Sequence, residues 1–353
     1  MELLFLTSTP ADPFEGSGTF VALDGLLRGL TRLGHRARVR GLGRRTGFHT
    51  LDRWLYNVAV ARRPPAGADV VVGLDLDGFL WARRRPRPPF VTALKGIIAD
   101  EARHERGWVR VLLGLQARWE RAACARADRV IVPSRYSADV AAAVYGVPPA
   151  RLAVVPEAVD LGEWRRLFAE VGAAPASRPT VLTVARMYPR KRLADLLEAA
   201  GRLRRRIPDL ALRIVGDGPE AARLRAHAGR LGLGGTVTFL GAVSRRALAV
   251  EYGRAHCFCL PSVQEGFGIV LVEAMAAGLP VVACRAAAVP EVVPAGRAGL
   301  LVEPRRPEAL ADALERLLTD ERLRKELGEG GRQHVERFDL EPVARAFTEA
   351  LPR

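Results

Sequence analysis

Two glutamates, eight positions apart, are the best candidates for chemistry, and they lie in the segment 261–280. Glu265 ends a loop after an apolar run, and Glu273 falls inside the sequence of an expected helix. Gly266 and Gly268 permit a sharp entry into that helix, whose first N–H groups can donate to a sugar or phosphate oxygen. A carboxylate accepts from two adjacent hydroxyls, which suits a ribose or hexose diol. A carboxylate on an apolar helix is costly unless something holds it, so Glu273 is interpreted either as ligand-binding or as half of a structural salt bridge.

A basic loop provides the second candidate. Arg186-Met-Tyr-Pro-Arg190-Lys191-Arg192 follows the apolar run 181–185 and holds four cations within seven residues. Arginine makes bidentate contacts and lysine acts as a point charge, so the loop suits a diphosphate. A solvated surface loop is the alternative, because charge runs usually face water. The turn Gly216-Asp217-Gly218 after the next expected strand is interpreted as mainly structural.

A third candidate lies near the start of the chain. Gly16-Ser17-Gly18 falls between the first apolar run and an amphipathic helix. Glycines let a backbone approach a ligand closely, and the helix N-terminus offers N–H groups to an anion. The loop does not have the GxGxxG pattern, so, judged alone, it is better interpreted as a plain turn.

The elements that must position these loops follow an alternating pattern. Short apolar, β-branched runs alternate with helical stretches, as expected of parallel strands buried on both faces. This pattern predicts an α/β fold of two Rossmann-like, doubly wound parallel-sheet domains. The stretch 172–179, rich in Pro, Ala and Gly, marks the boundary. We expect domains at 1–171 and 172–339, and a helix at 340–353 that could pack back on the first domain. The expected strands are 2–7, 37–41, 69–73, 90–94, 129–133, 152–156, 180–185, 211–216, 236–240, 256–260, 280–283 and 299–302.

Composition excludes several classes of protein. The 353 residues are 49% hydrophobic and 26% charged, which is typical of a folded chain rather than a disordered one. The first residues lack the basic region of a signal peptide, and no apolar stretch is long enough to span a bilayer, so we expect a cytoplasmic protein. The four cysteines lack CxxC spacing, so neither a zinc site nor a redox motif is expected.

The segment around Glu265 and Glu273 has the E-x7-E pattern of retaining GT-B glycosyltransferases, and it resembles glycosyltransferase family 4, group 1. The resemblance implies a GT-B fold, with two Rossmann-like domains that face each other across a cleft. The first domain would bind the acceptor and the second the nucleotide-sugar donor. The similarity covers most of the chain through Gly16-Ser17-Gly18, 132–137, 154–160, Arg186 with Lys191, and Gly216-Asp217-Gly218.

The resemblance also implies roles for residues. Arg186 and Lys191 would hold the donor diphosphate, Glu265 and the following amides the transferred sugar, and Glu273 the ribose diol. Val243 would contact the base. The implied catalytic residues are Glu265, Arg186 and Lys191, and the implied donor-binding residues are Gly16, Ser17, Gly18, Arg186, Lys191, Val243, Gly266, Phe267, Gly268, Ile269 and Glu273.

Two positions depart from the family pattern. Lys95 occupies the place where many relatives have a histidine, and it can either neutralise a phosphate or donate to a sugar hydroxyl. Glu157 stands where many relatives have an asparagine. Further acceptor or phosphate contacts could come from Asp100, Glu101 and His104, although a surface position is the better interpretation of His104, because charged residues surround it.

The resemblance implies transfer of a sugar, with retention at the anomeric carbon, from a nucleotide-diphosphate sugar to an acceptor hydroxyl on a glycan, glycolipid or small molecule. Neither a metal nor another cofactor is expected. One alternative is a nucleotide-sugar epimerase of the same fold. The other is a nucleic-acid-binding protein, which the net charge of +15 alone suggests. The excess is spread evenly, at 26 − 18 = +8 for residues 1–170 and 28 − 21 = +7 for the rest, so no nucleic-acid partner is expected.

One arginine cluster suggests a membrane partner. Between Arg28 and Arg63 there are ten arginines and one acidic residue. Leu51, Trp54, Leu55 and Val58 recur nearby at helical spacing, which fits a helix lying on anionic lipid or a helix whose apolar face covers a sheet. We predict weak, salt-sensitive binding of the first domain to anionic membrane, at its inner face.

Overall fold

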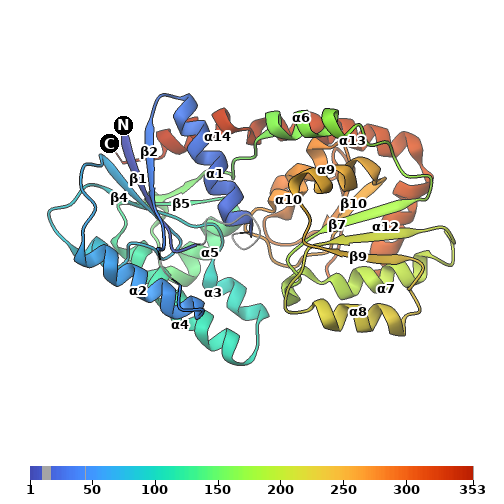
Figure 1. The fold of residues 1–353 in the computed structure, drawn as a ribbon, viewed down its shortest axis with the longest axis horizontal. Coiled ribbons are helices and arrows are strands. Elements are labelled where there is room, and N and C mark those ends of the chain that lie inside the picture. Colours follow the sequence, from blue (N-terminus) through green and yellow to red (C-terminus); the bar gives the residue numbers. More distant parts are fainter. Residues whose placement is uncertain (10–16, 44, 353) are drawn as a thin grey trace. The chain divides into compact units, whose positions relative to one another are not determined.

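The computed structural model describes residues 1–9, 17–43 and 45–352 and divides into two compact units (Figure 1). Unit 1 comprises Met1–Val159 and Phe338–Arg353, and unit 2 comprises Asp160–Arg337. The twelve expected strands are all present, and their ends differ from the predicted ones by no more than two residues. No helix of the described residues is long and apolar enough to cross a membrane.

Unit 1 is built on a parallel sheet of six strands in the order β2-β1-β3-β4-β5-β6. Alternate residues of β1 face opposite sides: Leu3 and Phe5 join one apolar cluster, and Leu4 and Leu6 join the other. Burial on both faces is what a near-continuous apolar run predicts. The strands are β1 (Glu2–Leu6), β2 (Arg36–Arg40), β3 (Val70–Leu74), β4 (Phe90–Ala93), β5 (Arg129–Val132) and β6 (Leu152–Val154).

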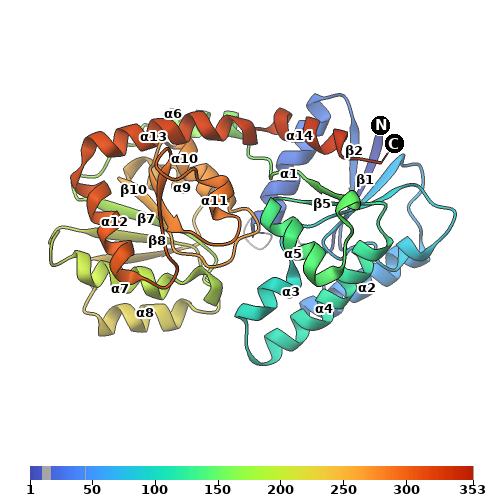
Figure 2. The same cartoon turned by 180° about the vertical axis from the view of Figure 1, so that it is seen from behind.

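Helices cover both faces of this sheet. On one face lie α1 (Ser17–Arg32) and α14 (Leu340–Glu349), which Figures 1 and 2 show side by side. On the other lie α2 (His49–Arg62), α4 (Gly107–Arg126) and α5 (Arg135–Tyr145). The short helices of this unit are α3 (Ile98–Glu101), η1 (Trp81–Arg83), η2 (Ala102–His104) and η3 (Pro149–Arg151).

The last helix packs closely on α1. A Cβ atom at Gly29 would lie 2.5 Å from the Leu340 carbonyl oxygen, so only glycine permits this approach. The Phe347 ring stacks on Phe5 with 6.0 Å between centroids. The C-terminal helix therefore completes the core of unit 1.

Unit 2 repeats the design with the strand order β12-β11-β10-β7-β8-β9. All its pairings are parallel within the named strands. The strands are β7 (Thr180–Val184), β8 (Ala211–Val215), β9 (Val237–Gly241), β10 (Cys257–Leu260), β11 (Val281–Cys284) and β12 (Gly299–Val302). The helices are α6 (Leu161–Val171), α7 (Leu193–Leu203), α8 (Ala221–Arg230), α9 (Arg245–Arg254), α10 (Ile269–Ala276), α11 (Val289–Val292), α12 (Pro307–Thr319) and α13 (Glu321–Val335), with η4 (Pro189–Lys191) and η5 (Glu336–Phe338).

The boundary between the two units lies one helix earlier in the chain than the sequence predicted. The sequence placed 161–171 in the first domain, whereas α6 belongs to unit 2. The reason is packing: the Trp164 ring lies edge-on to Tyr252 of α9, with 5.6 Å between centroids. A Pro/Ala/Gly stretch shows where regular secondary structure is interrupted. It does not show against which of the two units the preceding amphipathic helix packs its apolar face.

Candidate active site

The basic loop and the glutamate loop meet at the carboxyl edge of the unit 2 sheet. Lys191 Nζ lies 2.5 Å from Glu265 Oε1, and the two side chains are only 13% and 9% exposed. The loops also join through their backbones, because Val263 N–H donates to the Arg190 carbonyl at 3.0 Å. They follow β7 and β10, which are neighbours in the sheet. Two segments predicted separately therefore form one site.

Within the basic loop the cations have different environments. Lys191 is mostly enclosed, whereas Arg186 is exposed. The Tyr188 ring contacts two guanidinium groups, with its centroid 5.9 Å from that of Arg186 and 4.8 Å from that of Arg190. Such contacts orient arginines without neutralising them. The interpretation as a simple solvated loop fits Arg186 but not Lys191.

The turn after β8 is joined to the basic loop by backbone hydrogen bonds. Met187 N–H donates to the Asp217 carbonyl, and Glu220 N–H donates to the Met187 carbonyl. Gly216 has φ +116°, and a Cβ atom there would lie 2.1 Å from the Ala185 carbonyl oxygen. The turn is thus a structural support for the loop that carries Arg186, as its sequence indicated.

Helix α10 begins directly after the glutamate loop. Gly268 precedes it with φ +94°, a conformation that L side chains rarely adopt. This turn directs the chain from the buried Glu265 and Phe267 into Ile269, the first residue of the helix. The amides of Gly266, Phe267 and Gly268, which are predicted to hold the transferred sugar, therefore lie directly before the start of α10 and follow Glu265 in the chain.

Glu273 is the fifth residue of α10 and is buried. Its Oε2 accepts a hydrogen bond from the Tyr252 hydroxyl at 3.1 Å. Burial raises the pKa of Glu273 to about 7, against the opposing effect of the Arg245 charge and the Tyr252 hydrogen bond. The carboxyl therefore already has partners within the protein, which supports a structural role for Glu273, the alternative to ligand binding that the sequence left open. Its contact with a ribose diol stays a prediction.

The sequence contained no signal for the surroundings of Glu273. Tyr252 and Arg245 come from α9, and the Arg245 guanidinium stacks at 4.9 Å over Trp164 of α6. Val243, which is predicted to contact the base of the donor, is half-buried and lies in the segment between β9 and α9. Its role also stays a prediction.

In unit 1 the two departures from the family pattern touch each other. Lys95 Nζ lies 2.7 Å from Glu157 Oε2, with side chains 11% and 7% exposed. Lys95 follows β4 and Glu157 follows β6, at the carboxyl edge of the sheet. Asp75, which follows β3, accepts from the Lys95 backbone N–H at 2.9 Å.

A buried polar network that the sequence did not reveal lies at the same edge. Arg53 contacts Gln116 at 2.9 Å, Ser8 at 3.2 Å and Asp75 at 3.4 Å. Asp77 accepts from Ser8 and from Asn57, and burial raises its pKa to about 6 against the opposing charge of Arg53. These polar side chains of α2 face the protein interior.

The other predicted residues of unit 1 are dispersed. Asp100 is buried and accepts from the Tyr136 hydroxyl at 2.7 Å. The Glu101 carboxylate lies beside Gly96, next to Lys95, whereas His104 is half-exposed on η2. Ser17 and Gly18 begin α1, and Gly16 lies outside the described residues.

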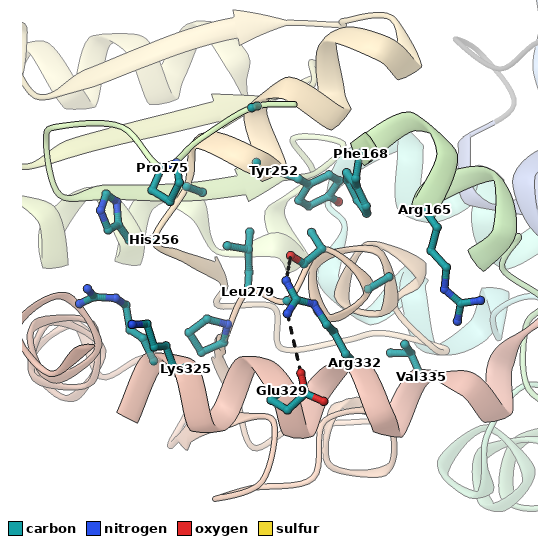
Figure 3. A pocket seen from close by; sticks show the side chains of 18 of the residues that line it. Arg165, Phe168, Pro175, Tyr252, His256, Leu279, Lys325, Glu329, Arg332 and Val335 are labelled. Atoms are coloured by element: carbon teal, nitrogen blue, oxygen red, sulfur yellow. Dashed lines mark hydrogen bonds and ion pairs between the residues drawn. The ribbon is translucent and has the colours of Figure 1, made fainter. Parts of the chain in front are cut away.

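A cavity of about 1010 Å³ in unit 2 lies at the opposite edge of the sheet, beside residues that precede β7, β10 and β11 (Figure 3). Its cations have partners: Arg332 contacts Glu329 at 3.8 Å, and Lys325 contacts Glu321 at 2.7 Å. Ligands of open α/β sheets bind at the carboxyl ends of strands. We therefore place the candidate site at the Lys191–Glu265 edge.

Two six-stranded parallel sheets flanked by helices, with polar loops at their carboxyl edges, define the GT-B fold class. Sucrose-phosphate synthase from Thermosynechococcus elongatus has this fold, with a TM-score of 0.80 at 23% identity over 99% of this chain and 98% of that one. Anabaena HepE in complex with UDP and glucose matches at a TM-score of 0.75 and 20% identity, over 99% and 98%.

The sequence comparisons identify the family. Residues 165–334 match the model for glycosyl transferases group 1, and residues 66–163 match that for glycosyltransferase family 4. A GDP-mannose-dependent alpha-(1-6)-phosphatidylinositol monomannoside mannosyltransferase from Mycobacterium tuberculosis is 34% identical over 251 residues, which is 68% of this chain and 64% of that protein. The chain belongs to the family 4, group 1 glycosyltransferases. The match spans less than two thirds of that relative's length.

Proposed function

We propose that the protein is a retaining glycosyltransferase that transfers a sugar from a nucleotide-diphosphate sugar to an acceptor hydroxyl. The observation that carries the proposal is the Lys191–Glu265 contact at the carboxyl edge of the unit 2 sheet, with an exposed Arg186 in the same loop as Lys191. The curated relatives are named as glycosyltransferases, and a structural neighbour is described in complex with UDP and glucose. These names favour transfer over the epimerase alternative.

The chemistry asks the protein mainly for charge stabilisation. The bond from the anomeric carbon to the donor phosphate oxygen breaks, and the bond to the acceptor oxygen forms on the same face. The nucleotide diphosphate leaves, and the acceptor's proton passes to a donor phosphate oxygen. Arg186 and Lys191 stabilise the charge that develops on the diphosphate. Glu265 holds the Lys191 ammonium in place and accepts from a hydroxyl of the transferred sugar.

The acceptor is proposed to be a polyol or sugar hydroxyl, carried on a lipid. The mycobacterial relative is named for GDP-mannose and a phosphatidylinositol mannoside. GDP-mannose is therefore the first donor to test. The reaction is proposed to need neither a metal nor another cofactor, and nucleic acid is not a proposed partner.

The test is a panel of nucleotide sugars, with release of free nucleotide diphosphate as the readout and NMR of the product for anomeric configuration. Glu265→Gln and Lys191→Met should each lower kcat/KM at least about a hundredfold, as removal of a transition-state charge contact does. Arg202→Met breaks an exposed ion pair with Glu308 on the same unit and serves as the control. No turnover of any donor, or conversion of the donor to its epimer without acceptor, would overturn the proposal.

We also propose that the enzyme is peripheral at an anionic membrane. The buried face of helix α2 comprises Asp52, Arg53, Tyr56, Asn57 and Val60. Leu51, Trp54 and Leu55 are exposed, so the interpretation that these three side chains cover the sheet is wrong. The adjacent α4 exposes Trp108 at 80%. The exposed apolar side chains of the two helices, together with the N-cap residue of α2, are here called the apolar face: Phe48, Leu51, Trp54, Leu55, Trp108, Val109, Val111, Leu112 and Leu115.

Charge supports an anionic lipid surface as the partner of this apolar face. Asp52 and Glu120, the acidic residues within α2 and α4, are both buried. Exposed arginines flank the apolar side chains: Arg45, Arg62, Arg63, Arg106, Arg110, Arg118 and Arg121. Basic residues near a bilayer each add about 1 kcal/mol with anionic lipid.

Sedimentation with vesicles tests the membrane proposal. Vesicles with about 30% phosphatidylglycerol carry a negative surface potential. Binding to these vesicles should exceed binding to pure phosphatidylcholine vesicles, and it should weaken as the salt concentration rises. Trp54→Ser with Trp108→Ser should abolish it, whereas Val154→Ser, at an exposed valine of β6, should not. Equal binding to neutral and anionic vesicles would contradict the proposal.

A further inference from the structure

The cavity of about 1010 Å³ at the amino-terminal edge of the unit 2 sheet has no task in the proposed glycosyl transfer. Its volume is that of a site for a small organic ligand. Figure 3 shows Glu329, Arg332 and Val335 of α13 along one side of the cavity, with Phe168 and Tyr252 opposite them. All of the lining residues belong to unit 2, so the cavity is formed within one compact unit.

The charged side chains that line the cavity are four cations and three carboxylates, a net charge of 4 − 3 = +1. Six of them form three ion pairs, which are Arg165 with Glu336, Lys325 with Glu321, and Arg332 with Glu329. The seventh, Arg324, forms no ion pair within the part of the chain that the structure describes. The lining is therefore balanced except at Arg324, and an unpaired cation attracts an anion.

The guanidinium of Arg324 is fixed in place and still has donors to offer. Its Nη1 donates to the carbonyls of Leu317 and Leu318 at 2.8 and 2.9 Å. These carbonyls belong to the last turn of α12, where a cation is favourable. With the described residues, Nε and Nη2 of Arg324 make no hydrogen bond. One phosphate or carboxylate group can accept from both of these nitrogens at once.

His256 adds a third donor at the same end of the cavity. The backbone N–H of Thr180 donates to His256 Nδ1 at 3.1 Å. Burial, and after it the charge of Arg324, hold the pKa of His256 below its usual range, so the ring is neutral and its hydrogen lies on Nε2. Figure 3 shows this ring at the end of the cavity away from Arg165. His256 Nε2 makes no hydrogen bond with a described residue.

The remainder of the lining is largely apolar. Aliphatic and aromatic side chains cover the space between the two ends: Phe168, Val171, Pro175, Leu279, Pro280 and Val335. Apolar ligand surface that is removed from water there gains about 25 cal/mol per Å². A cluster of donors at one end and an apolar lining beyond it suit a ligand with an anionic head group and an apolar body.

We propose that this cavity is a second ligand site, specific for an amphiphilic anion. Its phosphate or carboxylate accepts from Arg324 and His256, and its apolar body packs along Phe168 and Leu279. The site is at the opposite edge of the sheet from Lys191 and Glu265, so its ligand is neither the donor nor the acceptor. The proposal does not rest on the glycosyl transfer proposed above, and a binding measurement tests it without turnover.

The first test is calorimetric titration of the native protein with four small compounds. Octyl phosphate and octanoate have both halves of the expected ligand, whereas glycerol phosphate has only the charge and octanol only the apolar chain. At least one of the first two should bind about a hundredfold or more tightly than glycerol phosphate, because each buried methylene contributes about 0.8 kcal/mol. The same compound should bind at least about tenfold more tightly than octanol.

The second test places the binding in the cavity. Arg324→Met should weaken binding about ten- to a hundredfold, as loss of a charged hydrogen-bond partner does. His256→Asn retains an acceptor for the Thr180 N–H but removes the Nε2 donor, and it should weaken binding about two- to tenfold. The matched control, Arg332→Met with Glu329→Gln, removes a whole ion pair from the same lining and should leave the affinity within about twofold. The unfolding midpoint of each variant shows whether it folds.

Arg186→Met distinguishes this cavity from the candidate donor site. Arg186 is exposed in the basic loop, so the variant should bind the amphiphile as the native protein does. A loss of binding in Arg186→Met would instead place the compound at the diphosphate position and overturn the inference. Absence of binding by both octyl phosphate and octanoate, or equal binding of glycerol phosphate, would also overturn it. The comparison of the four compounds uses the native protein, so it decides even where a variant fails to fold.

Discussion

Replacement of Glu273 by glutamine should stabilise the protein at high pH and much less at low pH. Burial raises the pKa of the Glu273 carboxyl to about 7 in the folded state, whereas an unfolded glutamate has an ordinary pKa of 4.5. Between these values the folded state binds a proton that the unfolded state has lost. Stability therefore falls as pH rises from 4.5 to 7, and it is constant above that range.

The size of the effect follows from the two pKa values. At pH 8 ionisation of Glu273 costs the folded state about 3 kcal/mol, since each pKa unit corresponds to roughly 1.4 kcal/mol. At pH 5 the cost is below about 1 kcal/mol by the same linkage relation. The glutamine amide adds a cost that does not depend on pH. Glu273→Gln should therefore change the free energy of unfolding by about 2.5 kcal/mol more at pH 8 than at pH 5. The cost of the amide is the same at both pH values and cancels in this difference.

Urea unfolding of the native protein and the variant at both pH values measures this difference. Glu349→Gln, at an exposed carboxyl of α14, should show none. Tyr252→Phe removes the hydrogen bond that partly lowers the pKa of Glu273, so it should steepen the loss of stability with pH. A difference near zero for Glu273→Gln would show that the carboxyl is not held in a desolvated site, and the buried environment described above would be wrong. If Glu273 also binds the ribose diol, the same stabilised variant should bind the donor more weakly.

Three shorter predictions concern the donor site. Lys191→Met leaves the Glu265 carboxylate buried without its cation and should cost about 3–5 kcal/mol in urea unfolding; the double variant with Glu265→Gln should regain stability but not donor turnover. Gly216→Ala places a methyl group 2.1 Å from the Ala185 carbonyl oxygen and should lower the unfolding midpoint and raise the donor KM, whereas Gly234→Ala, with open space around it, should do neither. Chelation of divalent metal by EDTA should leave turnover unchanged; a loss that Mg²⁺ restores would refute the proposed metal independence.

The sequence predicted the strands well because most of them are short apolar runs, and the central ones, such as β3 and β10, are buried on both faces. The orientation of α2 was not predictable in the same way. Helical spacing shows that Leu51, Trp54 and Leu55 share a face, but it does not show whether that face meets a sheet or solvent. The answer depends on Arg53 and Asn57, whose partners Asp75 and Asp77 follow a strand that comes later in the chain.

The candidate site was predictable where the composition of a single segment indicates a ligand. Lys191 and Glu265 belong to segments whose composition already indicated a ligand. The contacts Lys95–Glu157 and Glu273–Tyr252 join residues that are far apart in the sequence, so no local sequence pattern predicts them. For Lys95 and Glu157, the sequence showed two departures from the family pattern, and only the structure showed that they are partners.

The use of lysine in this chain strengthens the functional interpretation of both ion pairs. Of the 54 basic residues, 51 are arginine and only Lys95, Lys191 and Lys325 are lysine. Lys325 is exposed on α13, but the other two are nearly enclosed and each contacts a carboxylate at the carboxyl edge of a sheet. In a chain so biased towards arginine, these two positions have a compact ammonium instead. The planar guanidinium is larger and would fill the space that a ligand hydroxyl or phosphate oxygen needs. Lys95→Arg and Lys191→Arg should therefore preserve charge and folding yet reduce turnover, whereas Lys325→Arg should change neither; full activity in both of the first two would show that any cation suffices there.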